Sequence, residues 1–85
     1  MTYSVEIAPA AKRQIKKLSK NIQQLIVERL EQLAEIPRPP GVLKMEGEES
    51  LYRIRVGDYR IIYEIQDRVL LIVIVKVGHR SSVYR

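Results

Sequence analysis

The sequence feature that most constrains the fold is a predicted β-hairpin over residues 51–64, LYRIRVGDYRIIYE, which turns at Gly57 and Asp58. Glycine readily adopts the positive φ that a two-residue hairpin loop requires, and the residues on both sides of the turn are typical of strands. If the loop holds two residues, Val56 faces Tyr59 and the pairing continues back along both strands. The turn therefore predicts which side chains lie opposite one another.

This register divides the hairpin into an apolar face and a basic face. Side chains alternate along a strand, so the residues at every second position share one side of the sheet. Arg55 is predicted to lie opposite Arg60, and Arg53 opposite Ile62. The face expected to meet the helices holds Tyr52, Ile54, Val56, Tyr59, Ile61, Tyr63 and Ile65, whereas the arginines lie on the other face.

Two interpretations of the basic face remain open from these residues. Directly opposed like charges destabilise a strand pair, so the arrangement needs a reason. Guanidinium groups match the oxygens of a phosphate, and Arg53, Arg55 and Arg60 together can bind a phosphodiester or stabilise a transition state that gains negative charge. The alternative is an ordinary solvated strand face, in which Glu64 and other acidic residues pair with the arginines.

The N-terminal part of the chain predicts one strand and two helices. Apolar and polar residues alternate over 2–7, as in a strand with one buried face. Pro9 suits the first turn of a short basic helix, and Ser19 suits the N-cap of a second amphipathic helix that ends before Pro37. We expect the two helices to form an antiparallel hairpin, although the apolar stripe nearly continues through residues 19–21.

A proline-rich connector and an acidic segment follow the helices. Residues 37–41, PRPPG, cannot continue a helix, and residues 42–45 suit a short edge segment. Glu46, Glu48 and Glu49 offer paired carboxylates for acid or base chemistry, but an acidic loop is the simpler interpretation.

Three further strands are expected, over residues 51–56, 59–66 and 69–77. The last is almost wholly apolar, which is typical of a strand that lies centrally or is covered on both faces. The predicted order is β-α-α-β-β-β, and we expect an α+β fold in which the helical hairpin packs on one face of a small, mainly antiparallel sheet. A chain of 85 residues is expected to form a single domain, residues 1–85.

The C-terminal segment VGHRSSVYR is predicted to approach the basic face. If the last strand runs antiparallel to its neighbour, its end returns to the Gly57 end of the hairpin and brings His79, Arg80 and Tyr84 with it. His79 is the only histidine, a residue type suited to proton transfer, although a lone histidine is more often structural. Tyr84 is able to stack on a base or to offer a hydroxyl.

Composition limits the function classes. Lysine and arginine outnumber aspartate and glutamate by 15 to 10, and the net charge of +5 favours a polyanionic partner. With no cysteine there is no disulfide or thiolate metal site, and no P-loop, dinucleotide-binding or metal-binding motif is present, so we expect no cofactor. The longest apolar run, residues 69–75, is too short to span a membrane, and the N-terminus does not resemble a signal peptide, so a cytoplasmic location is expected.

The hairpin and the tail together resemble the RelE/ParE superfamily of type II toxins. The resemblance covers nearly the whole chain: the first strand, the helical hairpin, YRIRVGDYRIIYEI and VGHRSSVYR. It implies a RelE-like fold and a toxin neutralised by a cognate, RelB-like antitoxin, through which the complex is able to bind operator DNA. In the RelE branch, it implies an mRNA interferase that cleaves messenger RNA in the ribosomal A site, where the RNA's own 2′-hydroxyl attacks the adjacent phosphate.

The resemblance also implies roles for individual residues. The family's active positions correspond to Arg53, Arg55, Arg60, Arg80 and Tyr84, with Arg60 and Arg80 holding the scissile phosphate and Tyr84 orienting the substrate. The tail is expected to stop at Arg85, without the C-terminal helix that some relatives carry, and so to leave the site more open.

Arg53 and Arg55 depart from the best-known RelE pattern, which has lysines at these positions. A guanidinium stabilises an anionic phosphorane but is not a credible general base, because it stays protonated. Proton transfer would then fall to His79, Tyr84, an acidic residue or the ribosome. The same departure keeps open a second hypothesis, a ParE-like gyrase inhibitor or a weakly catalytic relative that acts by binding.

Overall fold

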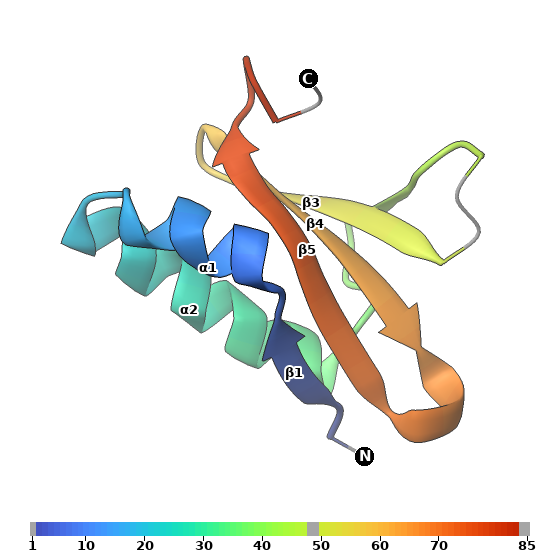
Figure 1. Cartoon of the computed structure of the whole chain (residues 1–85). Coiled ribbons are helices and arrows are strands. Elements are labelled where there is room, and N and C mark those ends of the chain that lie inside the picture. The colour runs from blue at the N-terminus through green and yellow to red at the C-terminus, as the bar shows by residue number, and fades with distance from the viewer. Residues whose placement is uncertain (1, 48–49, 84–85) are drawn as a thin grey trace.

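The fold consists of two helices packed on one face of a five-stranded sheet (Figure 1), and the computed structural model describes residues 2–47 and 50–83. The elements in chain order are β1 Ser4–Ile7, α1 Pro9–Lys16, α2 Lys20–Glu35, β2 Leu43–Lys44, β3 Leu51–Val56, β4 Tyr59–Gln66, the 3-10 helix Asp67–Val69 and β5 Leu71–His79. The strand order is β1-β5-β4-β3-β2, in which β1 is parallel to β5 and the other pairs are antiparallel. This arrangement confirms the predicted α+β class and the mainly antiparallel sheet.

The two helices are separate: α1 ends at Lys16 and α2 begins at Lys20, so the chain does break near residues 19–21, where the apolar stripe nearly continues. Ser19 is the N-cap of α2, and its Oγ accepts a hydrogen bond from the Ile22 N–H at 3.4 Å. The Gln23 side chain donates to the carbonyl of Leu18 at 3.0 Å and so gives a hydrogen-bond partner to a carbonyl just after the end of α1. The helix ends at Glu35, shortly before Pro37, because the residue before a proline disfavours helical backbone.

The core lies between the helices and the face of the sheet that they cover. Ile26 and Leu33 of α2 are fully buried, as is Ala11 of α1. They meet the apolar side of the hairpin, which the alternation of the sequence predicted. The sheet residues of this core are Ile54, Ile61, Tyr63, Ile65, Ile72, Ile74 and Val77, with Tyr52 and Val56 packed against them.

The hairpin between β3 and β4 has the predicted register. Val56 pairs with Tyr59, Arg55 with Arg60, and Arg53 with Ile62. Gly57 has a φ of 58°, whereas Asp58 is not in the positive-φ region. This combination is typical of a two-residue loop with glycine at its first position, and it explains why the strands meet without an intervening bulge at the turn.

The last strand is shifted by two residues from the predicted 69–77. Residues Asp67–Val69 form a 3-10 turn, and Leu70 adopts left-handed backbone with a φ of 51°, so β5 begins at Leu71 and ends at His79. Its position between β1 and β4 confirms that the strand is central. Val75 is nevertheless 36% exposed, so the helices cover only one of its faces.

Helix α1 also completes the hydrogen bonding of β5. Strand β1 pairs with β5 only as far as Ile7 opposite Ile74. Beyond that point the Val77 N–H donates to the Gln14 Oε1 of α1 at 2.7 Å. A side chain of the helix therefore replaces a strand partner and connects α1 to the end of β5 nearest the basic face.

Candidate functional site

The centre of the candidate site is the pair formed by Arg55 and Arg60 beside the turn of the hairpin. The Arg55 Nε donates to the carbonyl of Gly57 at 3.2 Å, and the Arg60 Nη1 donates to the same oxygen at 3.3 Å and to the carbonyl of Tyr59 at 3.0 Å. Within residues 2–47 and 50–83, neither guanidinium forms an ion pair. Two permanent positive charges are therefore held together by a backbone turn rather than by an acidic side chain.

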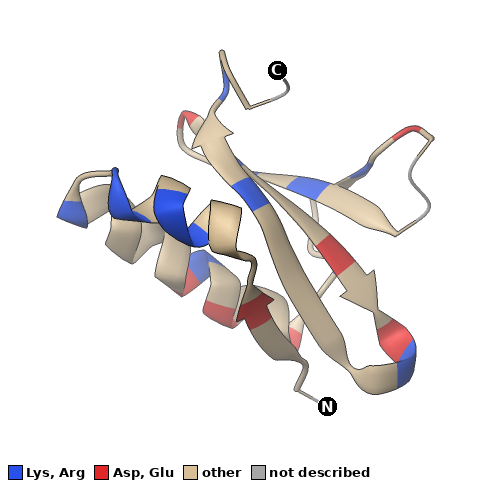
Figure 2. Ribbon diagram, in the orientation of Figure 1, with Lys and Arg blue, Asp and Glu red and all other residues tan. Residues whose placement is uncertain are grey.

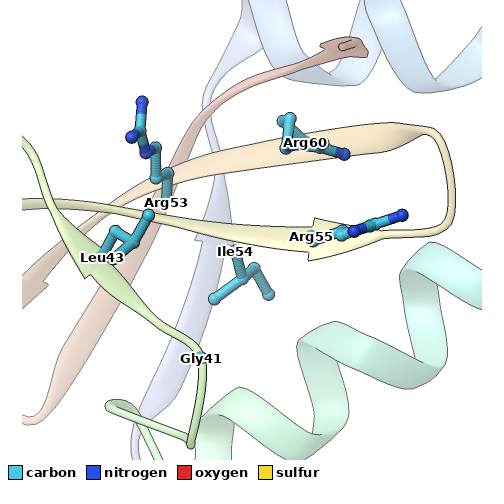
Figure 3. Close-up of a pocket in the computed structure, with 6 residues that line it drawn as sticks. All are labelled: Gly41, Leu43, Arg53, Ile54, Arg55 and Arg60. Carbon is cyan, nitrogen blue, oxygen red and sulfur yellow. The ribbon is translucent and has the colours of Figure 1, made fainter.

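A cavity of about 380 Å³ lies beside this pair, lined by Gly41, Leu43, Arg53, Ile54, Arg55 and Arg60. Figure 3 shows the side chains of Arg55 and Arg60 running together toward the turn, whereas Arg53 extends in a different direction from the same strand as Arg55. Arg53 pairs with Leu43 on its other side, so it lies on the rim toward β2. The arginines therefore provide one close pair and one separate cation.

The C-terminal segment joins this site through its backbone. Tyr59 pairs with His79, and the Arg80 N–H donates to the carbonyl of Asp58 at 2.8 Å, so Arg80 begins beside the hairpin turn. The Arg80 side chain is exposed, and it makes no hydrogen bond or ion pair with the described residues. Tyr84, the other tail residue expected at the site, lies outside the described residues.

Gly78 and Val83 position this segment, and neither was identified from the sequence. Val83 is 1% exposed, and a Cβ placed on Gly78 would lie 3.2 Å from the Val83 Cβ. The Val83 N–H donates to the carbonyl of His79 at 2.9 Å, which folds the chain back over the end of β5. A glycine inside an apolar strand is the sequence signal that could have indicated this close approach.

His79 is exposed at the end of β5, and its ring lies edge-on to Tyr59 with centroids 5.7 Å apart. The Nδ1 atom accepts from the Ser81 N–H at 3.2 Å and lies 2.8 Å from the Ser81 Oγ. In a neutral ring of this tautomer the proton is on Nε2. The ring then presents a donor to its surroundings, whereas a general base requires a free acceptor.

A second polar cluster lies at the end of the hairpin away from the Gly57 turn. The Arg38 Nη2 lies 2.9 Å from the Asp67 Oδ2, the Tyr3 hydroxyl donates to the Asp67 Oδ1 at 2.6 Å, and the Arg38 Nε donates to the Tyr52 hydroxyl at 3.2 Å. The hydrogen bond from Arg38 lowers the pKa of Asp67 to about 2. No sequence signal links these residues, because Arg38 and Asp67 are 29 positions apart.

Tyr63 connects the core to the proline-rich connector. Its hydroxyl donates to the carbonyl of Pro37 at 2.8 Å, and its ring is fully buried. Burial raises the pKa of Tyr63 to about 12, against the opposing positive charges of Arg38 and Arg29. Arg29 of α2, which no sequence pattern singled out, lines a cavity beside the hairpin turn.

The charges are unevenly distributed over the molecule, with basic residues along α1 and on the hairpin (Figure 2). In the part of the chain that the structure describes, no group of three histidine, cysteine or acidic side chains is placed to hold a metal ion, and no helix is long and apolar enough to cross a membrane. Of the three glutamates considered for acid or base chemistry, Glu46 is exposed, while Glu48 and Glu49 lie outside the described residues.

Comparison with known proteins identifies the family. A family model described as the ParE toxin of the type II toxin–antitoxin system parDE matches residues 5–84. A putative RelE-like toxin protein of Escherichia coli is 34% identical over 88 residues, covering 99% of this chain and 92% of that protein. The mRNA interferase toxin RelE of Escherichia coli K12 is 26% identical over 88 residues, with the same coverage of 99% and 92%.

A solved structure gives the same result for the fold. In the crystal structure of the archaeal RelE–RelB complex from Pyrococcus horikoshii, one chain matches with a TM-score of 0.85 and 33% identity, covering 96% of this chain and 99% of that chain. Sequence and fold agree over nearly the full length. The chain therefore belongs to the ParE toxin family of type II toxin–antitoxin systems and is a RelE-like toxin.

Proposed function

We propose that this toxin is an endoribonuclease that cleaves messenger RNA in the ribosomal A site and so inhibits translation. The observation that carries the proposal is the Arg55–Arg60 pair, in which two guanidinium groups converge on the Gly57 carbonyl without an acidic partner in residues 2–47 and 50–83. Such a pair is costly in the free protein and favourable once a phosphate lies against it. The name of the Escherichia coli K12 relative, mRNA interferase toxin RelE, supports the same reaction.

In the proposed reaction the 2′-hydroxyl of the RNA attacks the adjacent phosphorus. The new P–O2′ bond forms as the P–O5′ bond breaks, so the products are a 2′,3′-cyclic phosphate and a 5′-hydroxyl. The intermediate phosphorane gains negative charge, which Arg55, Arg60 and Arg80 would stabilise through charged hydrogen bonds. Arg53 would contact the flanking backbone, because its side chain extends away from the pair.

Proton transfer is the part of this reaction that the arginines do not supply. One proton must leave the 2′-hydroxyl and another must reach the departing O5′. His79 presents Nε2–H in its neutral tautomer, so it suits donation to the leaving oxygen better than abstraction. In this proposal the base is provided by the ribosome or by Tyr84.

We place the reaction in the cytoplasm and expect a cognate antitoxin to inhibit it. The relative from Pyrococcus horikoshii was solved as a RelE–RelB complex, which supports a RelB-like partner for this chain. Acidic residues of an antitoxin would offset the charge of the Arg55–Arg60 pair in place of RNA. Binding of the toxin–antitoxin complex to operator DNA would take place through the antitoxin.

A gyrase inhibitor is the second candidate function. Two observations favour it: arginine replaces the lysines of the best-known RelE pattern at Arg53 and Arg55, and the matching family model is described by the name ParE. A binding protein of this kind would need the basic face but not a proton donor or acceptor.

One expression experiment separates the two candidates. The chain is expressed under tight control, and cleavage of messenger RNA is compared with plasmid supercoiling, beside an Arg60→Ala, Arg80→Ala double variant. The nuclease proposal expects cleaved messenger RNA with normal supercoiling, and loss of both cleavage and growth arrest in the double variant. Growth arrest with intact messenger RNA and lost supercoiling would refute it, and full toxicity of the double variant would refute the assigned site.

A further inference from the structure

A second cavity, of about 280 Å³, lies between α2 and the hairpin turn. Its lining comes from the helix and from the strand that carries the arginine pair: Leu25, Glu28, Arg29, Gln32, Arg55, Val56 and Gly57. In Figure 3, α2 passes beside the end of the hairpin that bears Arg55. Arg55 lines both this cavity and the 380 Å³ cavity, so the two lie beside the same residue.

Arg29 is the unexplained group in this second cavity. Its Nε is buried and has no hydrogen-bond partner in the part of the chain that the structure describes, while its Nη1 donates to the Gln32 Oε1 at 3.2 Å. Buried polar atoms are almost always paired in folded proteins, so an unpaired one requires an explanation, and a bound ion is one of them. The missing partner must accept hydrogen bonds and is favoured if it is negatively charged.

We propose that this cavity is a second phosphate subsite of the toxin, which holds a phosphodiester neighbouring the one bound by Arg55 and Arg60. The inference rests on the proposed nuclease function, because it names further substrate contacts of the same site. Arg29 and Arg55 bind the phosphate, and the apolar side chains of Leu25 and Val56 lie against the sugar or base. Among the described residues that line the cavity, Glu28 is the one carboxylate, so it weakens anion binding and is available to a ribose hydroxyl.

A trinucleotide tests this arrangement directly because it carries two phosphodiesters, one for each cavity. The probe is a 2′-deoxy trinucleotide, which lacks the attacking hydroxyl and is not cleaved. The chain is titrated while the arginine Nε–H resonances are followed by NMR. We expect the resonances of Arg29 and Arg55 to move together with the trinucleotide, and that of Arg29 to stay in place with a dinucleotide bound through its single phosphodiester at the pair.

Three variants give the inference a quantitative form. Arg29→Gln is expected to weaken trinucleotide binding by about tenfold, since it removes one charged hydrogen-bonding group. It should also reduce the slope of log affinity against log salt by about 0.7, as expected for one lost phosphate contact. Glu28→Gln should strengthen binding, and Arg13→Gln, the same charge change on an exposed position of α1, should leave the slope unaltered.

The outcomes distinguish this inference from the nuclease proposal. If the Arg29 resonance does not move when that of Arg55 does, or if Arg29→Gln binds as Arg13→Gln does, the subsite is refuted even when ribosome-bound messenger RNA is cleaved. If both resonances move but messenger RNA stays intact on the ribosome, the subsite stands and the nuclease proposal fails. If the Arg29 resonance shifts with an acidic peptide but not with the trinucleotide, the cavity is a protein-docking site and nucleotide binding there is refuted.

Discussion

Two arginine clusters at opposite ends of the hairpin differ in how their charge is compensated. Arg38 has a carboxylate, two tyrosine hydroxyls nearby and the ring of Tyr52 5.1 Å from its guanidinium carbon. Arg55 and Arg60 face each other across β3 and β4 and share one backbone carbonyl. The first cluster is compensated within the folded chain, whereas the second has no acidic partner among residues 2–47 and 50–83.

The difference shows that residue type alone does not indicate the role of an arginine. Arg38 fastens the proline-rich connector to the turn before β5, and its partner Asp67 is held ionised. The paired arginines oppose folding slightly, so their presence is better explained by binding than by stability. The two clusters should therefore respond in opposite ways when their charges are altered.

The largest effect is expected when the pair is made to resemble the Arg38 cluster. Arg55→Glu places a carboxylate opposite Arg60, so a cross-strand ion pair should raise the free energy of unfolding by about 0.2–1 kcal/mol. Cleavage of ribosome-bound messenger RNA should fall by at least about a hundredfold, because two cations are withdrawn from the phosphate. Urea unfolding and a cleavage assay measure both quantities.

Arg55→Gln is the control for that substitution, since it removes the charge without supplying a partner. It should lower cleavage less than Arg55→Glu does. A variant that gains stability and retains full cleavage would show that the pair is not the phosphate site.

The next effect concerns the C-terminal turn, which belongs to the paired-arginine end alone. Gly78→Leu should displace Val83 and with it Arg80, because even a Cβ at this position lies 3.2 Å from the Val83 Cβ. We expect a loss of about 1–3 kcal/mol in the free energy of unfolding from overpacking, and a fall in cleavage of about tenfold. Gly78→Ala is the milder control. An unchanged cleavage rate in Gly78→Leu would show that the C-terminal turn does not contribute to the site.

A smaller effect, on stability alone, is expected at the other cluster. Arg38→Ala removes the ion pair with Asp67 and the contact with Tyr52, and it should lower the free energy of unfolding by about 1 kcal/mol. Cleavage should stay within about twofold of the unaltered toxin, because Arg38 does not line either cavity beside the pair. A large loss of cleavage with unaltered stability in Arg38→Ala would show that the Arg38 cluster serves cleavage rather than stability.

The smallest expected effect is on how stability depends on pH in the acid range. The pKa of Asp67 falls from 3.8 to about 2 on folding, so its contribution to stability is complete above its unfolded value and is lost as the pH falls toward 2. Between these values the unaltered toxin should lose stability more steeply than Asp67→Asn. Unfolding curves at several pH values measure this, and parallel curves for the two proteins would exclude Asp67 as the cause.

Local patterns in the sequence were sufficient for much of the fold and for part of the site. The glycine of the turn and the period-two alternation predicted the pairing of Arg55 with Arg60, because hairpin register follows from turn length. The N-cap at Ser19 was also predicted, since its side chain bonds within a few residues along the chain. The start of the last strand was not, because the left-handed backbone of Leu70 has no signal in an apolar residue.

The sequence by itself determined the elements, the register of the hairpin and the charge of its basic face, because these depend on neighbours in the chain. Only the tertiary structure decided which arginines are compensated. Arg38 reaches Asp67 across 29 positions, and Arg29 and Arg55 line one cavity between a helix and the hairpin turn. Such pairings depend on how the helices are set against the sheet, and the long-range packing of the core determines that.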